Sequence, residues 1–452
     1  MSMETVGQDS DTDETPLIDV RNLQTAFFTE KETIRAVDGV SMDIDSGETV
    51  GVVGESGSGK SVTARSIMGL VEAPGKVLEG SSIRFHQLET VRDYADRFSG
   101  HTVDLTELRG EHDPQELLGR IQTEVTAETF GRERRDEITL TDILAAGFGD
   151  EMGITDEDDC VFVTERNGDS PQDITAGFIE VTRLDGERQR QMRGGRIGMV
   201  FQDPLTSLNP VFTVGNQIKE ALNLHRDLSG EEATREAVEL LEAVGIPDAG
   251  RRVNEYPHQF SGGMRQRAVI AMALACEPEL LICDEPTTAL DVTIQAQILE
   301  LLAQIQEERD IGIMFITHDM GVIAEVSDKV NVMYAGEVIE QADVYSLFEN
   351  PKHPYTRGLL RSIPGTQSGE RLETIEGNVP TPTESASDCR FAPRCPEAFD
   401  ACEVVHPSHV EVGEEGDDHT AACLLYPEEM PETRRVNVHR EATSDDRRGD
   451  SA

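Results

Sequence analysis

One segment of the chain has the residue types and spacing of a phosphate-binding loop. It comprises Gly54, Glu55, Ser56, Gly57, Ser58, Gly59, Lys60 and Ser61, which fit the pattern G-x-x-x-x-G-K-[ST]. The glycines let the backbone curl so that successive N–H groups point at a phosphate, and Lys60 can reach the β and γ oxygens. The Ser61 hydroxyl can ligate Mg²⁺. We therefore predict a site for ATP and Mg²⁺ here, with Val62 at the start of the helix that follows.

A second candidate site lies where an apolar segment ends in two carboxylates. Residues 280–283 form a continuous apolar run of the kind found in buried parallel strands, and Asp284 and Glu285 follow it. Asp284 can hold Mg²⁺ through water, and Glu285 can polarise an attacking water molecule. A strand that simply ends in solvent is an equally good explanation of this segment alone. Its place after the phosphate loop favours the catalytic interpretation.

Alternating apolar strands and amphipathic helices must position these residues. The expected strands are 17–20, 40–44, 49–53, 82–85, 196–201, 280–283 and 312–317. The expected helices are 62–71, 231–244, 265–275 and 294–308. Such alternation implies an α/β domain built on a parallel sheet.

Residues 86–183 interrupt this pattern with an acidic stretch of weak periodicity, which we interpret as an insertion. Residues 115–125 and 136–146 are expected as helices and 161–164 as a strand, so we favour a small ordered insert over a long loop.

A segment that precedes Asp284 reads Ser-Gly-Gly-Met-Arg-Gln-Arg, and its first three residues are Ser261, Gly262 and Gly263. It resembles the signature motif of ATP-binding-cassette (ABC) ATPases. A Ser-Gly-Gly turn that opens a helix presents N–H donors suited to the γ-phosphate of ATP held by a partner's loop. Met264 departs from the glutamine common in this motif, at a position that varies in the family. The resemblance covers roughly Leu17 to Glu340. It implies a RecA-like parallel core, an antiparallel β subdomain and a helical signature subdomain.

The resemblance also implies roles for residues outside the two motifs. Gln202 is similar to the Q-loop glutamine, which contacts Mg²⁺ and the γ-phosphate, and His318 to the switch histidine. Asp291 ends the D-loop sequence Ala-Leu-Asp. Phe27 stands where the family has an aromatic that stacks on adenine, with Phe28 as the alternative.

Three further segments resemble the ATPase subunits of dipeptide, oligopeptide and nickel importers. They are the stretches at 201–210, 350–356 and 389–396. This resemblance implies a nucleotide-sandwich dimer with a second, related ATPase subunit, which makes a heterodimer the expected assembly. It also implies two membrane permease subunits and an external solute-binding protein.

Four of the seven cysteines lie near the C-terminus, with the spacing C-x5-C-x6-C-x20-C. They are Cys389, Cys395, Cys402 and Cys423. Four thiolates can bind Zn²⁺ or an iron–sulfur cluster, although a zinc ribbon is disfavoured because no C-x2-C pair is present. The importer resemblance implies a [4Fe-4S] cluster, and Zn²⁺ or unligated thiols remain as alternatives. Cys276 and Cys283 stand in apolar context and are expected in the core.

The composition is strongly acidic. The 452 residues include 87 Asp and Glu against 40 Lys and Arg, a formal net charge of −47, which excludes a basic face for nucleic acid. Only six basic residues are lysine, and the acidic residues are spread along the chain. This pattern favours a surface adapted to high salt, because screening mutes self-repulsion while carboxylates keep the surface hydrated. A cationic partner is the alternative.

The chain has no run of about 18 apolar residues and no charged-then-apolar leader. We therefore expect a cytoplasmic protein, bound peripherally at the cytoplasmic face of the membrane. The expected organisation is a disordered acidic arm (1–16), an ABC ATPase domain (17–345), an importer-type C-terminal region (346–427) and a charged tail (428–452).

These patterns predict an ATP hydrolase that energises the import of dipeptides or oligopeptides. A nickel importer of the same family is an alternative, because the ATPase never touches the solute. A soluble ABC ATPase of DNA repair or translation is a third possibility. It is disfavoured because the chain has a single phosphate loop and no sustained heptads.

Overall fold

The predicted phosphate loop follows β3 (Thr49–Val53), a fully buried strand in the larger of two sheets. The computed structural model describes residues 15–121, 125–130, 132, 134–202, 207–288, 290–363, 375–413 and 418–444. The expected disordered arm falls almost wholly outside these residues. Among the described helices, none is long and apolar enough to cross a bilayer.

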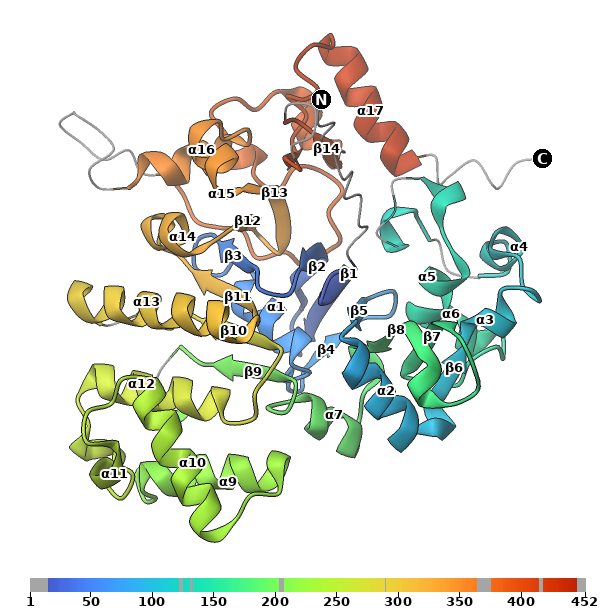
Figure 1. The fold of residues 1–452 in the computed structure, drawn as a ribbon. Coiled ribbons are helices and arrows are strands. Elements are labelled where there is room, and N and C mark those ends of the chain that lie inside the picture. The colour runs from blue at the N-terminus through green and yellow to red at the C-terminus, as the bar shows by residue number, and fades with distance from the viewer. Residues whose placement is uncertain are drawn as a thin grey trace, which may run out of the picture.

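The larger sheet has a parallel centre, as expected from its buried apolar strands. Its order is β14-β15-β13-β12-β3-β11-β10-β9, and the five strands from β12 to β9 run parallel (Figure 1). Besides β3, its strands are β9 (Ile197–Val200), β10 (Leu280–Asp284), β11 (Gly312–Thr317), β12 (Lys329–Tyr334), β13 (Glu337–Asp343), β14 (His409–Glu411) and β15 (Thr420–Ala422). The carboxyl ends of β3, β10 and β11 share one edge, so the loops that follow them lie close together.

The second sheet is antiparallel except for one pair. Its order is β2-β1-β5-β8-β7-β6, with β4 paired to β1, and β6 runs parallel to β7. Its strands are β1 (Ile18–Phe28), β2 (Thr33–Ile44), β4 (Gly75–Val77), β5 (Ser82–Phe85), β6 (Thr102–Asp104), β7 (Val161–Arg166) and β8 (Ile174–Glu180). This sheet and the parallel centre of the larger one match the antiparallel subdomain and RecA-like core of the expected fold class.

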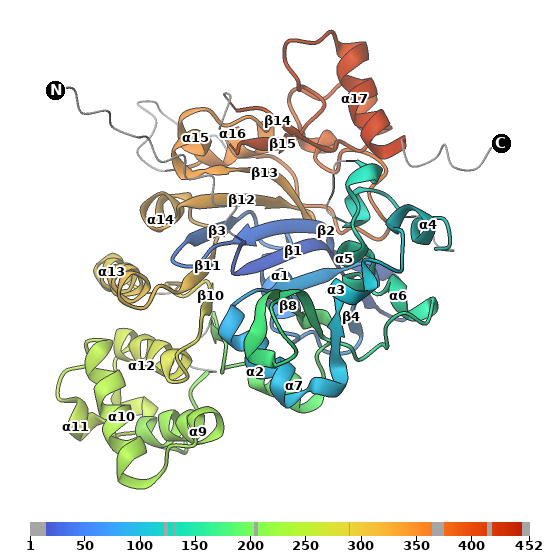
Figure 2. The same ribbon diagram turned by 45° about the vertical axis from the view of Figure 1, so that its right-hand side comes forward.

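The helices of residues 60–361 that lie outside residues 86–192 flank the larger sheet or form a separate group. Figures 1 and 2 show α9 to α12 gathered at one corner, apart from α1. The helices are α1 (Lys60–Ile67), α9 (Val214–Arg226), α10 (Gly230–Ala243), α11 (Ala249–Arg252), α12 (Gly262–Leu274), α13 (Val292–Arg309), α14 (Met320–Val326), α15 (Val344–Glu349) and α16 (Pro354–Arg361). The corner group is the helical subdomain that the signature motif implied.

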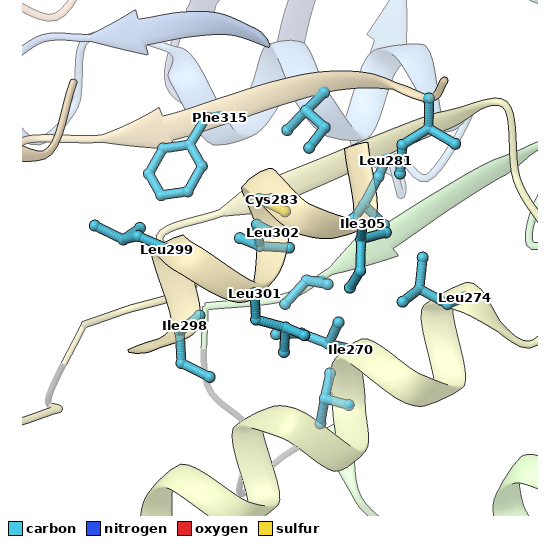
Figure 3. Packing of buried hydrophobic residues seen from close by; sticks show 14 of the residues in the cluster. Ile270, Leu274, Leu281, Cys283, Ile298, Leu299, Leu301, Leu302, Ile305 and Phe315 are labelled. Atoms are coloured by element: carbon cyan, nitrogen blue, oxygen red, sulfur yellow. The ribbon is translucent and has the colours of Figure 1, made fainter. Parts of the chain in front are cut away.

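Helix α13 joins this group to the parallel sheet. Its apolar face, with Leu302 at the centre, packs between β10 and β11 on one side and α12 on the other (Figure 3). Leu281 and Phe315 project from the strands, and Ile270 from α12, and all of these side chains are buried. Cys276 and Cys283 belong to the same core, as predicted.

The described residues of the segment 86–183, which the sequence predicted to be an insertion, form an ordered unit. It contributes β6, β7 and β8 to the antiparallel sheet and has a hydrophobic core of its own that includes Phe130 and Ile143. Its helices are α2 (Leu88–Arg97), α3 (Leu105–Leu108), α4 (Pro114–Leu118), α5 (Leu140–Ala145) and α6 (Phe148–Glu151), and α7 (Gly186–Met192) follows it. The strand expected at 161–164 lies in β7. Both expected helices are shorter than predicted. Helix α4 begins at Pro114 but ends at Leu118, and residues 122–124 of its expected range lie outside the described residues. Helix α5 starts four residues late, because Thr139 caps its N-terminus.

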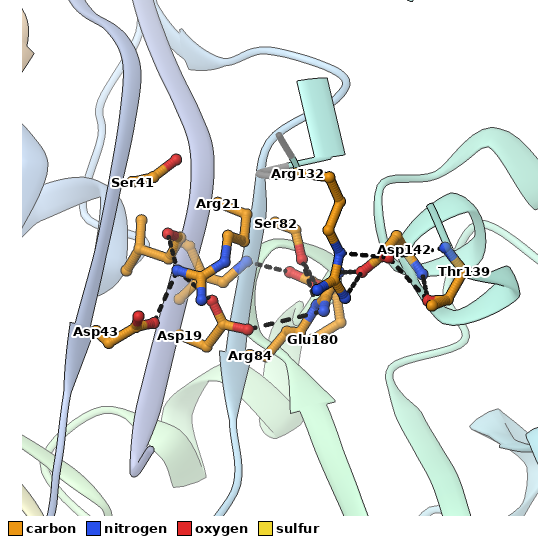
Figure 4. Close-up of polar contacts among 12 residues, drawn as sticks. Asp19, Arg21, Ser41, Asp43, Ser82, Arg84, Arg132, Thr139, Asp142 and Glu180 are labelled. Carbon is orange, nitrogen blue, oxygen red and sulfur yellow. Dashed lines mark hydrogen bonds and ion pairs between the residues drawn. The ribbon is translucent and has the colours of Figure 1, made fainter. Parts of the chain in front are cut away.

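A buried ionic network fixes this unit to β1 and β5. Asp142, on α5, accepts hydrogen bonds from Arg84 Nη2 on β5 at 3.1 Å and from Arg132 Nε at 2.9 Å (Figure 4). Arg84 Nη1 also lies 3.7 Å from Asp19 Oδ2 on β1. On β8, Glu180 is fully buried and accepts a hydrogen bond from the Ser82 hydroxyl at 2.6 Å. The segment 86–183 is therefore anchored to β1 and β5 of the antiparallel sheet.

The C-terminal part of the chain is more structured than the sequence suggested. Strands β14 and β15 extend the larger sheet beside β13, and α17 (Glu432–Ser444) lies in the region expected to be a charged tail. Val436 and His439 of α17 are buried. Three-residue strands and a largely polar helix carry little local signal, because tertiary pairing stabilises them.

Candidate functional site

The phosphate loop has the backbone geometry that its glycines predicted. Gly59 has a φ of +106°, and a Cβ there would lie 2.4 Å from the Ala36 carbonyl oxygen. A Cβ on Gly57 would have no atom within 4 Å, so the space beside Gly57 is open. No side chain caps the N-terminus of α1, which leaves its first N–H groups to face this opening. The loop is therefore built to receive an anion.

Lys60 and Ser61 project from the first turn of α1 toward the loop and the neighbouring strand. Lys60 Nζ donates to the carbonyl oxygens of Gly54 at 2.7 Å and Glu55 at 3.0 Å. The Ser61 hydroxyl donates to Asp284 Oδ1 at 2.8 Å. The two motifs, 223 residues apart in the sequence, thus meet in one site.

Glu285, the second carboxylate at the end of β10, contacts three polar side chains. Gln202 Nε2 donates to Oε2 at 2.8 Å, and the Thr288 hydroxyl donates to the same oxygen at 2.9 Å. His318 Nδ1 lies 3.2 Å from Oε1. Glu285 has a φ of +50°, a strained conformation that its N–H bond to the Ile316 carbonyl oxygen helps to hold. Three predicted residues therefore converge, and Thr288, which no motif indicated, joins them.

The two carboxylates of this site have opposite electrostatic environments. Burial raises the pKa of Asp284, against the hydrogen bond from Ser61. Burial also acts on Glu285, but hydrogen bonds from His318 and Thr288 outweigh it and hold the pKa of Glu285 below its ordinary value. Burial lowers the pKa of Lys60. Burial thus outweighs the neighbouring cations Arg65 and Lys60 at Asp284, whereas hydrogen bonds favour the ionised form of Glu285.

The arrangement fits a magnesium nucleotide. Hydroxyl and carboxylate oxygens are the ligands Mg²⁺ prefers, and Ser61 and Asp284 bring them together beside the open loop. Gln202 lies on the other side of Glu285, within the described residues, whereas the next four residues of its motif lie outside them. Ser56, Ser58 and Val62 belong to the loop and to α1 as predicted.

The signature residues stand apart from the phosphate loop of the same chain. Ser261 caps α12 by accepting a hydrogen bond from the Met264 N–H at 3.4 Å, and Gly262 and Gly263 form the first turn. Asp291 likewise caps α13. A Cβ on Gly263 would lie 2.7 Å from the Ile294 side chain, so the signature turn packs against the start of α13. Ala289 of the predicted D-loop lies outside the described residues.

The two candidate adenine-stacking aromatics occupy the end of β1. Phe27 is half-buried and lies against Gly75, where a Cβ would approach its ring to 2.6 Å. Phe28 is 51% exposed. Both rings therefore remain candidates on position alone.

The four C-terminal cysteines lie in one module but do not form a metal-holding group. Cys389 N–H donates to the Cys402 carbonyl oxygen at 3.0 Å, and the Cys423 thiol interacts electrostatically with the other three. Burial raises the pKa of Cys389 and Cys423 to about 12 in each case. Within the described ranges, no three His, Cys, Asp or Glu side chains converge as metal ligands do. The donor chemistry of four thiols suits a soft metal, which would deprotonate the thiols on binding.

Comparisons with known proteins agree with the site. Residues 37–145 and 168–288 match the ABC transporter family, and residues 339–402 match the family described as oligopeptide/dipeptide transporter, C-terminal region. The chain is 41% identical over 418 residues to the oligopeptide transport ATP-binding protein AppD of Bacillus subtilis, covering 92% of this chain and 98% of AppD. It is 39% identical over 410 residues to the dipeptide transport ATP-binding protein DppD of the same organism, covering 90% and 94%.

Among solved structures, a dimeric ATP-binding cassette in a post-hydrolysis state with ADP and Pi is similar at 22% identity and a TM-score of 0.47. The match covers 72% of this chain and 98% of that one. The family matches and the identities to AppD and DppD, together with the converged nucleotide site, show that the chain belongs to the ABC transporter ATPases of the oligopeptide/dipeptide importer family.

Proposed function

We propose that this ATPase hydrolyses ATP to energise the uptake of dipeptides or oligopeptides through membrane permease subunits. One observation carries the proposal. A phosphate loop with its neighbouring carboxylates and a C-terminal region of the oligopeptide/dipeptide transporter type lie on the same chain. The relatives named above are peptide transport ATP-binding proteins, which supports this choice of solute.

We assign the residues of the site different roles in hydrolysis. The loop N–H groups and Lys60 would bind phosphate oxygens. Ser61, Asp284 and Gln202 would hold Mg²⁺, which would neutralise charge on the phosphates when bound. Glu285, ionised and hydrogen-bonded in a fixed orientation, takes a proton from the attacking water. His318 and Gln202, on either side of Glu285, sense the γ-phosphate.

The site requires a second ATPase subunit to be complete. Figure 2 shows α12, which the turn at Ser261 to Gly263 opens, apart from α1, which follows the phosphate loop. We therefore propose that this signature turn caps the nucleotide of a partner. Asp291 would lie at the same interface, since α13 begins beside the signature turn. A heterodimer with a related ATPase is the proposed assembly. Phe27 is proposed to stack on adenine.

A surface beside Gln202 supports docking to a permease. A cavity of about 690 Å³ lies between β9 and the helical subdomain, lined by Phe201, Gln202, His225 and Met272 among others. Phe212, nearby in the sequence, is 51% exposed. This cavity would place the permease next to the residue that contacts Glu285. The proposed location is therefore peripheral, at the cytoplasmic face of the membrane, with a solute-binding protein outside.

The four-cysteine module is proposed to bind a [4Fe-4S] cluster, with Zn²⁺ or free thiols as alternatives. The support is the donor set of four thiols in one module, and no step of hydrolysis is assigned to it. Anaerobically purified chain should be brown and contain iron and labile sulfide, and Cys389→Ser should lose both. Colourless, iron-free protein from the same preparation would contradict this proposal.

The acidic surface is proposed to be an adaptation to high salt. The net charge of −47 and the use of arginine over lysine support it. The salt dependence of the thermal midpoint tests this proposal.

The transported solute can be tested on the assembled complex. The chain is purified from membranes, its permeases and binding protein are identified, and ATP hydrolysis is measured with di- and oligopeptides and with Ni²⁺. Stimulation by peptides alone would support the proposal, and stimulation by Ni²⁺ alone would favour the nickel importer. A chain that purifies without permeases and hydrolyses ATP at a rate no solute changes would favour a soluble ABC ATPase.

A further inference from the structure

Glu55, the second residue of the phosphate loop, contacts the C-terminal extension at two points. Its carboxylate accepts two hydrogen bonds from Arg394, Nη1 to Oε2 at 2.7 Å and Nη2 to Oε1 at 3.1 Å. Its backbone N–H donates to the Tyr355 hydroxyl at 2.9 Å. The loop motif leaves this position unspecified, so phosphate binding alone does not account for these contacts.

The Arg394 guanidinium is held firmly. Its side chain is only 6% exposed. Besides Glu55, it donates to the Tyr334 hydroxyl at 3.3 Å and to the backbone carbonyl oxygens of residues 375–377 at 2.9 to 3.3 Å. A planar guanidinium with this many fixed acceptors has one available orientation.

The surroundings of Arg394 connect this orientation to the fold of the extension. The backbone N–H of Arg394 donates to the Phe391 carbonyl oxygen at 2.9 Å, in the short turn between Cys389 and Cys395. The Phe391 ring packs on the buried Tyr355 ring with centroids 5.4 Å apart. The two side chains that hold Glu55 thus rest on one aromatic cluster.

A third contact to Glu55 comes from Lys60, whose Nζ donates to the Glu55 carbonyl oxygen at 3.0 Å. Lys60 is the residue that must also reach the phosphates. The loop is rich in glycine and has a high entropic cost of ordering, so anchors that persist when Lys60 turns to a ligand lower the cost of binding it.

We propose that Arg394 is a positioning residue of the phosphate loop. Together with Tyr355 it holds Glu55 and keeps residues 54–59 in the curl that receives the phosphates of ATP. Through it, the fold of the cysteine-containing extension sets the nucleotide affinity of the ATPase domain. This inference rests on the proposed assignment of the loop to ATP.

The experiment compares variants of the full chain by titration calorimetry with ADP and by steady-state ATP hydrolysis. Arg394→Gln should raise the Kd for ADP and the KM for ATP about tenfold, because the loop loses its preorganisation. The kcat at saturating ATP should stay within about twofold of wild type, since Glu285, Gln202 and His318 are untouched. Arg394→Lys keeps the charge without the bidentate geometry, so its Kd for ADP should lie between those of wild type and Arg394→Gln.

Arg390 provides the matched control. It is an equally buried arginine of the same extension, but it pairs with Asp38 on β2 and donates to the Ala335 carbonyl oxygen at 2.7 Å. Arg390→Gln removes a docking contact of the extension without touching the phosphate loop. Its Kd for ADP should stay within about twofold of wild type. If the Kd for ADP rose equally in Arg390→Gln and Arg394→Gln, the proposal would be overturned, because the cause would then be a general loss of docking of the extension.

A double variant separates positioning from simple charge compensation. If Arg394 only neutralised the Glu55 carboxylate, Glu55→Gln would tighten ADP binding and the double variant would restore wild-type affinity. Positioning predicts that Glu55→Gln weakens binding about as much as Arg394→Gln, and that the double variant is no worse than either. Wild-type affinity in Glu55→Gln or in the double variant would overturn the proposal, even if Arg394→Gln failed to fold. Failure of the wild-type chain to bind ADP would instead refute the assignment of the loop to ATP.

Discussion

Replacing Glu285 by Gln should remove most of the catalysis while leaving the nucleotide site assembled. The side chain accepts or shares hydrogen bonds with Gln202, Thr288 and His318 at 2.8, 2.9 and 3.2 Å. A carboxamide has the same shape but a single acceptor oxygen, so at most one of these contacts is lost, worth about 1 kcal/mol. The fold and the phosphate loop should therefore persist.

Glu285→Gln should slow the chemical step far more than it changes the fold or ATP binding. A neutral carboxamide cannot take the proton of the attacking water, and general base catalysis contributes about 10²- to 10⁴-fold. We expect kcat to fall by this factor, about 3–5 kcal/mol in activation free energy. The Kd for ATP should change by less than about threefold.

The pH dependence follows from the environment of Glu285. Hydrogen bonds from His318 and Thr288 overcome the effect of burial and hold the pKa of Glu285 below its ordinary value of 4.5. The charged form is thus favoured in the folded state, and its contribution to stability is present above pH 4.5 and lost only as the pH falls through the lowered value. Any loss of wild-type activity from Glu285 protonation should therefore have its midpoint below pH 4.5.

The assay is phosphate release by the purified chain or its complex, with ATP binding measured in parallel. Glu307→Gln, on an exposed face of α13, is the control and should keep wild-type turnover. Residual turnover of Glu285→Gln within tenfold of wild type would refute its role as base. Loss of ATP binding together with turnover would refute the view that the site stays assembled.

Three further predictions concern stability. Leu302→Ala should cost about 2–5 kcal/mol, seen as a lower urea midpoint, because α13 loses its contact at the centre of the core; an unchanged midpoint would contradict this packing. Arg84→Met should cost about 2–3 kcal/mol in the same assay, since buried Asp142 keeps only Arg132 as an ion-pair partner; no change would mean that the segment 86–183 is not anchored there. The thermal midpoint of the wild-type chain should rise by several degrees between about 0.1 M and about 2 M KCl, as the Debye length falls from about 10 Å to below 3 Å; an equal midpoint in both would argue against a salt-adapted surface.

The parts of the site that the sequence predicted are those whose chemistry is local. The phosphate loop, the carboxylates after β10 and the signature turn each depend on a few consecutive residues, and the parallel order of the strands then brings Ser61 to Asp284. Thr288 was missed because a threonine in a turn has no distinctive pattern. Its role appears only when its hydroxyl is seen on Glu285.

Contacts between distant segments could not be predicted. Arg394 and Glu55 are 339 residues apart, and neither residue type at its position signals the other. Strand β8 was missed because Gly177 interrupts its apolar run and its pairing with β5 and β7 comes from tertiary structure. Helix α17 is largely polar, so its helical pattern was masked by charge.

The central claim is that hydrolysis at Glu285 drives peptide uptake. It is tested most directly by ATP-dependent uptake of a labelled dipeptide or oligopeptide into proteoliposomes that contain the complete complex. The complex carries either the wild-type chain or Glu285→Gln. We predict uptake with the wild-type chain that requires ATP and the binding protein and is lost in the variant. Peptide uptake that persists with Glu285→Gln, or no peptide uptake by an assembled complex that hydrolyses ATP, would contradict the account.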